Sequence, residues 1–206
     1  MPQVAATTVR GLVQHFESVL GPVRSGWMSA PTGEQLPYQV VRYATGPDTG
    51  SVAYSSLGLS RHALLAADGT TVRQEVLVLA TKSLPVEYVL GMVQTITEAM
   101  LTSGRPLCQG EVLGAGPAGL NDSAMVEVYV ALPVYFDDSF ATFVSAEGMN
   151  VEVMWLVPVT AAEAQFVRVH GWERFEDLLL AEDPDLVDVF RTPVVPDSVV
   201  PAPVAS

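Results

Sequence analysis

A glycine-rich run in the middle of the chain has the residue types that could bind a nucleotide. Gly114-Ala115-Gly116-Pro117-Ala118-Gly119 matches the pattern G-x-G-x-x-G, in which the first amides of a helix hold a pyrophosphate. That chemistry needs a helix directly after the glycines. Here Asn121-Asp122-Ser123 follows, and a period of two begins at Met125, which indicates a strand. We therefore expect a tight loop between two antiparallel strands and no cofactor; an enzyme that binds a nucleotide or small molecule with this loop stays an alternative.

The other residues that could act in catalysis or bind a metal lack the necessary spacing. Ser60 and His62 stand in Gly-Leu-Ser-Arg-His, which differs from a nucleophile elbow at its fifth residue. The three histidines are isolated and Cys108 is the single cysteine, so the chain offers no spacing typical of metal ligands. The pair Asp137-Asp138 is typical of a solvated turn. The sequence therefore predicts no catalytic residue and no metal site.

Acidic residues gather near the C-terminus, where they could bind a basic partner. Seven of them lie between positions 173 and 188, with Arg174 as the one basic residue among them. Opposite charges on two proteins steer their encounter and raise the association rate. A solvated helix face is the alternative explanation. The candidate partner-binding residues are Glu173, Glu176, Asp177, Asp185 and Asp188.

Composition limits the classes of function. The chain has 206 residues, 49% of them hydrophobic, and a formal net charge of −13. Ten Lys and Arg residues in total argue against nucleic-acid binding, which depends on basic contacts to phosphates. The sequence contains no apolar run of about 18 residues and no basic-then-apolar leader, so we expect no membrane segment and no signal peptide. One cysteine fits a reducing compartment, and we expect a cytoplasmic protein.

The elements that position these residues alternate between helical and strand patterns. Helices are predicted at residues 8–20, 85–104, 160–170 and 172–180, and strands at 39–43, 51–57, 72–81, 111–113, 125–134 and 150–159. Residues 22–37 are expected to form a loop, and Pro158 to end the last strand. Short connections favour antiparallel or mixed pairing. We predict one α+β domain over residues 1–191, a mixed and mostly antiparallel sheet with helices packed against it, and an extended or disordered tail over 192–206.

The last two helices carry clear end signals. Thr160 and Glu163 have the spacing of a capping box, in which each side chain accepts a hydrogen bond from the other residue's amide. Gly171 is placed to adopt a left-handed conformation at the end of the first helix. Trp172 and Phe175 then begin an apolar face of the second helix.

Several short motifs resemble the bacterial suppressor-of-fused-like domains. The strongest is an apolar strand ending in Val-Pro-Val-Thr, a helix, a glycine, a short acidic helix and the ending Asp-Leu-Val-Asp-Val-Phe-Arg-Thr-Pro-Val-Val at 185–195. Upstream, Ser-Ser-Leu-Gly-Leu-Ser at 55–60, Arg-Gln-Glu-Val at 73–76, and Arg-Pro-Leu at 105–107 with Gly110 are similar to further elements of that family. The matches cover nearly the whole chain in the same order; the glycine-rich run at 114–119 departs from the family pattern.

The resemblance implies a binding domain without enzymatic activity. Animal members of the family are similar to a two-lobed clamp that adds a transcription-factor peptide as a strand, and bacterial members are similar to immunity proteins that neutralise a toxin. We therefore expect a protein-binding module, an immunity protein with a basic, toxin-like partner. The enzyme described above and a structural subunit of a larger assembly are the alternatives.

Overall fold

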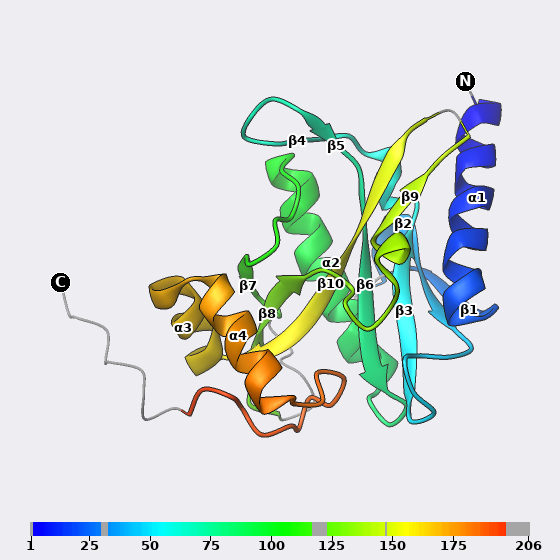
Figure 1. Cartoon of the computed structure of the whole chain (residues 1–206). Coiled ribbons are helices and arrows are strands. Elements are labelled where there is room, and N and C mark those ends of the chain that lie inside the picture. The colour runs from blue at the N-terminus through cyan, green and yellow to red at the C-terminus, as the bar shows by residue number, and fades with distance from the viewer. Residues whose placement is uncertain (1, 30–32, 117–122, 147, 197–206) are drawn as a thin grey trace.

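The computed structural model describes residues 2–29, 33–116, 123–146 and 148–196. Figure 1 shows a central sheet with helices on both of its faces. The helices are α1 (Pro2–Leu20), α2 (Val86–Ser103), α3 (Ala161–His170) and α4 (Trp172–Glu182), with short 3-10 helices η1 (Leu59–Arg61) and η2 (Asp138–Ala141). The strands are β1 (Val23–Ser29), β2 (Gln35–Tyr43), β3 (Ser51–Leu57), β4 (Leu64–Leu65), β5 (Thr71–Val72), β6 (Gln74–Thr81), β7 (Val112–Gly114), β8 (Met125–Ala131), β9 (Thr142–Val144) and β10 (Asn150–Thr160).

The sheet is mixed and mostly antiparallel, as predicted. Its order is β1-β2-β3-β6-β10-β8-β7, with β9 paired to the first part of β10. The pairing of β10 with β6 is parallel, and the other described pairs in this sheet are antiparallel. Strands β4 and β5 form a separate small hairpin. The predicted α+β class in one domain is confirmed.

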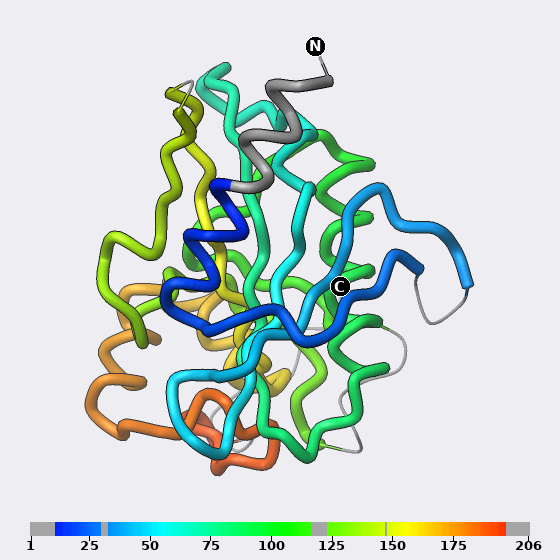
Figure 2. The backbone as a smooth tube through the Cα atoms, turned by 90° about the vertical axis from the view of Figure 1, so that its right-hand side faces the viewer, coloured from blue at the N-terminus to red at the C-terminus, as the bar shows by residue number. Residues whose placement is uncertain are grey.

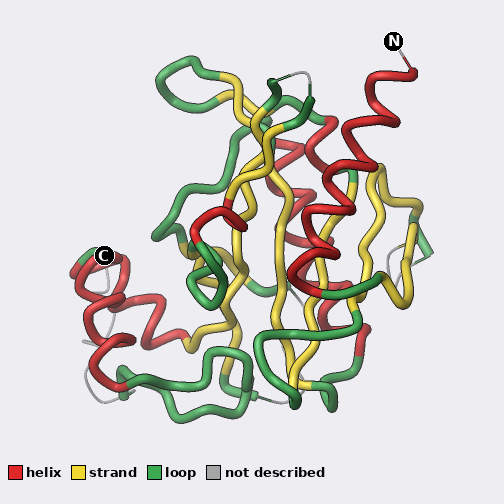
Figure 3. Tube along the Cα trace, turned by 45° about the vertical axis from the view of Figure 1, so that its right-hand side comes forward, coloured by secondary structure: helices red, strands yellow, loops and turns green. Residues whose placement is uncertain are grey.

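Two hydrophobic cores fill the two faces of the sheet. Helix α2 covers one face, where Val89, Val93 and Ile96 pack on β2, β3, β6, β8 and β10. Helix α1 and the pair α3–α4 cover the other face. Figure 2 shows α1 and α2 on opposite sides of the strands, and Figure 3 shows α3 and α4 together at one end of the sheet. The central strands are therefore buried on both faces, which explains their nearly continuous apolar sequences.

Two expectations about strands were wrong. Residues 23–29, expected in a loop, form β1, which is an edge strand of the described sheet and pairs there with β2; most of its residues are exposed, so an apolar alternation was not required. Pro158 does not end β10, which continues to Thr160. Beyond Trp155 the strand pairs, among the described strands, with β8 alone, so a residue without an N–H is tolerated on the other side.

The boundaries of α3 follow its sequence closely. Thr160 and Glu163 form the predicted capping box, with amide-to-oxygen distances of 3.1 and 3.0 Å. Gly171 has a positive φ of 87°, but its ψ of 157° places it outside the left-handed helical region that was predicted. This combination is nearly restricted to glycine. It turns the chain sharply, so that α4 packs against α3.

The first residues after the predicted boundary at 191 also contact the fold. Val195 is buried in the core shared with α3 and α4, and the amide of Val194 donates to Glu163 Oε1 over 2.9 Å. Residues up to 195 therefore have partners in the fold, and the domain boundary at residue 191 stays a prediction. Residues 197–206 of the expected tail lie outside the described residues. Within the described part of the chain, no helix is both long and apolar enough to cross a membrane.

Candidate functional site

The acidic residues predicted to bind a partner differ in their exposure and in their contacts with the fold. Glu173 and Asp177 are exposed on α4. Glu176 is half-buried and accepts hydrogen bonds from Tyr129 Oη at 2.8 Å and Gln109 Nε2 at 3.0 Å. The carboxylate of Glu176 therefore faces the sheet and is engaged by the fold, unlike the exposed side chains of Glu173 and Asp177. Burial and the bond to this carboxylate both raise the pKa of Tyr129, so its hydroxyl stays a donor.

Asp185 and Asp188 follow α4, and each closes a turn. Asp185 Oδ1 accepts from the amide of Val187 at 3.0 Å, and Asp188 Oδ1 accepts from the amide of Phe190 at 2.9 Å. Each carboxylate thus has one local backbone partner. Asp185 is exposed and Asp188 is half-buried, so Asp185 in particular still presents its charge to solvent.

A pocket lies between α4 and the sheet, beside these acids. Its volume is about 240 Å³. Two neighbouring cross-strand pairs form its floor: Trp155 opposite Ala131, and Val157 opposite Tyr129. Residues two apart on a strand face the same side of the sheet, so β10 and β8 together present one continuous apolar floor.

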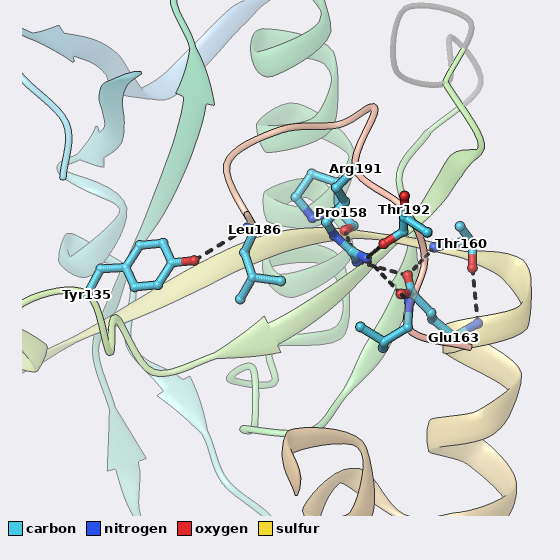
Figure 4. A network of polar contacts seen from close by, with 8 residues as sticks. Tyr135, Pro158, Thr160, Glu163, Leu186, Arg191 and Thr192 are labelled. Carbon is cyan, nitrogen blue, oxygen red and sulfur yellow. Dashed lines mark hydrogen bonds and ion pairs between the residues drawn. The ribbon is translucent and has the colours of Figure 1, made fainter. Parts of the chain in front are cut away.

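The walls of the pocket come from three segments: the loop after β8, helix α4 and the turn after α4. Val134 and Tyr135 line it from the loop after β8, Leu179 and Leu180 from α4, and Leu186 from the turn after α4. The amide of Leu186 donates to Tyr135 Oη at 3.3 Å, which ties two of the walls together (Figure 4). Leu180 and Val134 are 82% and 69% exposed, so apolar surface continues from the pocket to solvent.

Trp155 is the largest side chain of the floor. It is fully buried, and its ring centroid lies 4.9 Å from that of Tyr135. The indole Nε1 has no hydrogen-bond partner among the described residues. A buried tryptophan usually finds a partner for this group, so the unsatisfied N–H is a second unusual feature of the pocket.

A buried ion pair fixes the segment that follows the pocket. Arg191 Nη1 and Nη2 lie 2.8 and 2.9 Å from Glu163 Oε1 and Oε2, and both side chains are almost completely buried. Arg191 Nη2 also donates to the carbonyl of Pro158 at 3.4 Å. Figure 4 shows these groups converging from β10, α3 and the C-terminal segment. The bidentate geometry holds residues 185–195 against the domain.

The upstream sequence motifs meet around a second buried carboxylate, Glu75. Glu75 accepts hydrogen bonds from Ser56 Oγ at 2.5 Å, the amide of Gly58 at 2.8 Å, and the amide and hydroxyl of Ser60 at 3.1 and 2.7 Å. Burial raises the pKa of Glu75, and these hydrogen bonds oppose the shift. The Ser60 hydroxyl is therefore a buried structural donor, which removes it as a candidate nucleophile.

The neighbouring motif residues also serve the fold. Gln74 exchanges two hydrogen bonds of 2.9 Å with the backbone of Leu107. Arg73 donates to the carbonyls of Ser60 and Arg61 at 2.6 and 3.0 Å. Residues from motifs that are far apart in sequence thus connect β6, η1 and the segment after α2 by hydrogen bonds. The contacts of these residues stabilise the fold.

The glycine-rich run does not have the surroundings of a dinucleotide site in its described part. Gly114 ends β7 and lies opposite Glu127 of β8 in an antiparallel pair, as predicted for a loop between antiparallel strands. Residues 117–122 lie outside the described residues. Elsewhere, the described residues contain no group of three His, Cys, Asp or Glu side chains that could hold a metal ion.

The pocket itself was not predicted. The alternation in 150–159 places Trp155 and Val157 on one face, which is the signal that the sequence offers. It does not reveal that α4 leaves this part of the face open, because that depends on the turn at Gly171 and on the path of residues 183–186. The pocket is a product of tertiary packing.

Known proteins resemble this chain in sequence and in fold. The immunity protein YqcF of Bacillus subtilis (strain 168) is 24% identical over 150 residues, which is 72% of this chain and 77% of that protein. A suppressor of fused homologue from Neisseria gonorrhoeae FA 1090 has a similar structure, with a TM-score of 0.70 and 17% identity, over 96% of this chain and 100% of that one.

Two further solved structures share the fold. A chain of the Sufu–Fu complex has a TM-score of 0.65 and 16% identity, over 93% of this chain and 92% of that one. Drosophila Suppressor of Fused has a TM-score of 0.64 and 18% identity; 93% of this chain matches 51% of that one. The family model described as Suppressor of fused protein (SUFU) matches residues 34–192, the part of the sequence that contains strands β2 to β10, α2, α3, α4 and Arg191. The chain therefore belongs to the suppressor of fused protein family.

Proposed function

We propose that this chain is a protein-binding module without enzymatic activity that acts as an immunity protein and neutralises a toxin partner in the cytoplasm. The observation that carries the proposal is the apolar pocket beside α4 with acidic residues at its border, a combination typical of recognition surfaces. The likeness to an immunity protein over most of the chain supports the class of partner.

The partner is expected to be basic. The net charge of −13 and the exposed Glu173 and Asp177 on α4 favour a positively charged surface on the other protein. Charges at the border of an interface act mainly on the association rate. The partner should therefore associate faster at low than at high salt concentration.

The first test is functional rescue. A tagged chain is expressed in its native host and the captured protein is cloned. That protein should stop growth when expressed alone, and co-expression of this chain should restore growth. Capture of nothing, or of a protein that is harmless alone, would contradict the immunity function. A thermal shift with FAD, NAD or ATP would favour the enzyme with the 114–119 loop instead.

A matched pair of charge variants tests the surface. Glu173→Lys with Asp177→Lys should slow association with the captured toxin about tenfold, because the steering field reverses locally. Glu87→Lys with Glu98→Lys makes the same charge change on exposed positions of α2, across the sheet. If the two double variants slow association equally, the net charge of the protein determines the association rate, and the α4 surface has no special role.

A further inference from the structure

We infer that the pocket over Trp155 is an anchor site that takes one aromatic or branched apolar side chain of a protein partner, flanked in that partner by Lys or Arg. The inference rests on the proposed binding function and specifies the chemistry of what is bound. It assigns the flanking bases to Asp183, which lines the pocket, and to the exposed acids near it in sequence, Glu182 and Asp185.

The size of the pocket fits a side chain. A dry engineered cavity of about 150 Å³ accepts benzene, and this pocket has about 240 Å³. The walls of Leu179 and Leu180 are apolar, and Trp155 and Val157 lie buried below them, so a phenyl, indole or branched aliphatic group would meet a mostly apolar lining. Anchor residues of protein interfaces are commonly of this kind.

The unpartnered indole of Trp155 points to the same location. Its Nε1 is buried without an acceptor among the described residues, and the indole contacts the ring of Tyr135 in a tilted arrangement. Tyr135 is half-exposed and is held by one long hydrogen bond to Leu186. A partner segment whose side chain displaces this ring outward would bring backbone carbonyls of the same segment near the indole, and these carbonyls are acceptors.

The charge at the mouth selects the partner. Asp183 lines the pocket, and Glu182 and Asp185 are exposed on either side of it in sequence. Glu176 also lines the pocket, but its carboxylate is occupied by Tyr129 and Gln109. An acidic segment would be repelled here, and a second copy of this chain would bring the same acidic border. A segment with basic residues beside its apolar anchor is complementary.

Three short peptides test the inference directly. They share a Gly-Ser frame around the cores Lys-Phe-Lys, Lys-Ala-Lys and Glu-Phe-Glu. The readout is the indole N–H resonance of Trp155 in a two-dimensional ¹H–¹⁵N spectrum, assigned with the variants Trp27→Phe and Trp172→Phe. The Lys-Phe-Lys peptide should shift this resonance and bind at least tenfold more tightly than either of the others. No shift of Trp155, or equal binding of all three peptides, would overturn the inference.

A matched pair of leucine variants separates this pocket from general charge effects. Leu180→Lys places a cation at the mouth, at a position that is 82% exposed, and should weaken binding of the Lys-Phe-Lys peptide at least tenfold. Leu65→Lys makes the same change at a 60% exposed leucine of β4 and should leave binding unchanged. Both positions are on the surface, so both variants should keep the wild-type unfolding midpoint. Equal effects on peptide binding would overturn the inference.

The anchor and the proposed function fail in different ways. If the captured toxin binds Leu180→Lys as tightly as wild type, the anchor is refuted and the immunity function stands. If the peptide binds as expected but no toxin is found, the anchor stands and the immunity function falls. If light scattering detects a dimer that Leu180→Lys abolishes, the occupant is a second copy of this chain, and the basic partner is refuted.

Discussion

Replacement of Arg191 by Met should destabilise the domain strongly, because it leaves a charge without a partner in the core. The side chains of Arg191 and Glu163 are 3% and 0% exposed and form two hydrogen bonds of 2.8 and 2.9 Å. Removal of one member of such a pair costs about 3–5 kcal/mol. The carboxylate would keep its two backbone donors, the amides of Thr160 and Val194, which do not replace the lost positive charge.

Helix α3, which carries Glu163, also provides a matched control. Arg168 of α3 forms an ion pair with Glu127 of β8, but its side chain is 46% exposed. An exposed pair of this kind contributes about 0–1 kcal/mol, so Arg168→Met should have a small effect. Urea denaturation at pH 7, followed by circular dichroism, gives the free energy of unfolding of both variants. The difference between them should be about 2–5 kcal/mol.

A double variant separates the buried charge from the lost packing. Glu163→Gln with Arg191→Met removes both charges, and should recover part of the stability lost in Arg191→Met, because no uncompensated charge remains in the core. If Arg191→Met costs no more than Arg168→Met, the C-terminal segment is not held by this ion pair. If the double variant is less stable than Arg191→Met alone, the uncompensated carboxylate is not the cause of the loss.

Three further predictions follow from single residues. Burial raises the pKa of Glu75 above its ordinary value of 4.5. The contribution of protonated Glu75 to stability is therefore complete below pH 4.5 and is lost as the pH rises through the native pKa. Glu75→Gln should remove this pH dependence from urea midpoints measured between pH 4.5 and 8; the same pH dependence in variant and wild type would contradict the prediction. A Cβ on Gly110 would lie 2.3 Å from Trp172 Cγ at a φ of +86°, so Gly110→Ala should lower the free energy of unfolding by about 2–5 kcal/mol; a wild-type value would contradict the contact. Tyr129→Phe leaves Glu176 with one donor and should cost about 1–3 kcal/mol in the same assay; a neutral result would mean that water replaces the hydroxyl.

Local signals in the sequence were sufficient for most of the fold. The period of two in 150–159 and the capping box at Thr160 each depend on neighbouring residues, and both were confirmed. The break between the two helices at Gly171 was also found, but the left-handed conformation predicted for this glycine was wrong, because its ψ is 157°. Strand β1 was missed because an edge strand with exposed side chains needs no apolar alternation. Pro158 was misjudged because its tolerance depends on where β6 stops pairing with β10, which no local pattern contains.

The candidate site could be predicted only in part, for a related reason. The acidic surplus after residue 172 is visible in the sequence, whereas the engagement of Glu176 by Tyr129 joins residues 47 positions apart. The pocket likewise combines β8, β10 and α4. Charge is a property of composition, but a cavity is a property of packing between distant segments.

The position of β10 in the sheet has a consequence for synthesis on the ribosome. This strand lies between β6 and β8, yet it is the last strand of the sheet to be translated. Until residue 160 has emerged, the block β1-β2-β3-β6 and the pair β8-β7 each present an unpaired edge, and such edges favour aggregation. The domain is thus expected to complete its sheet only near the end of translation, and ribosome stalling before β10 should yield protease-sensitive chains that associate with chaperones.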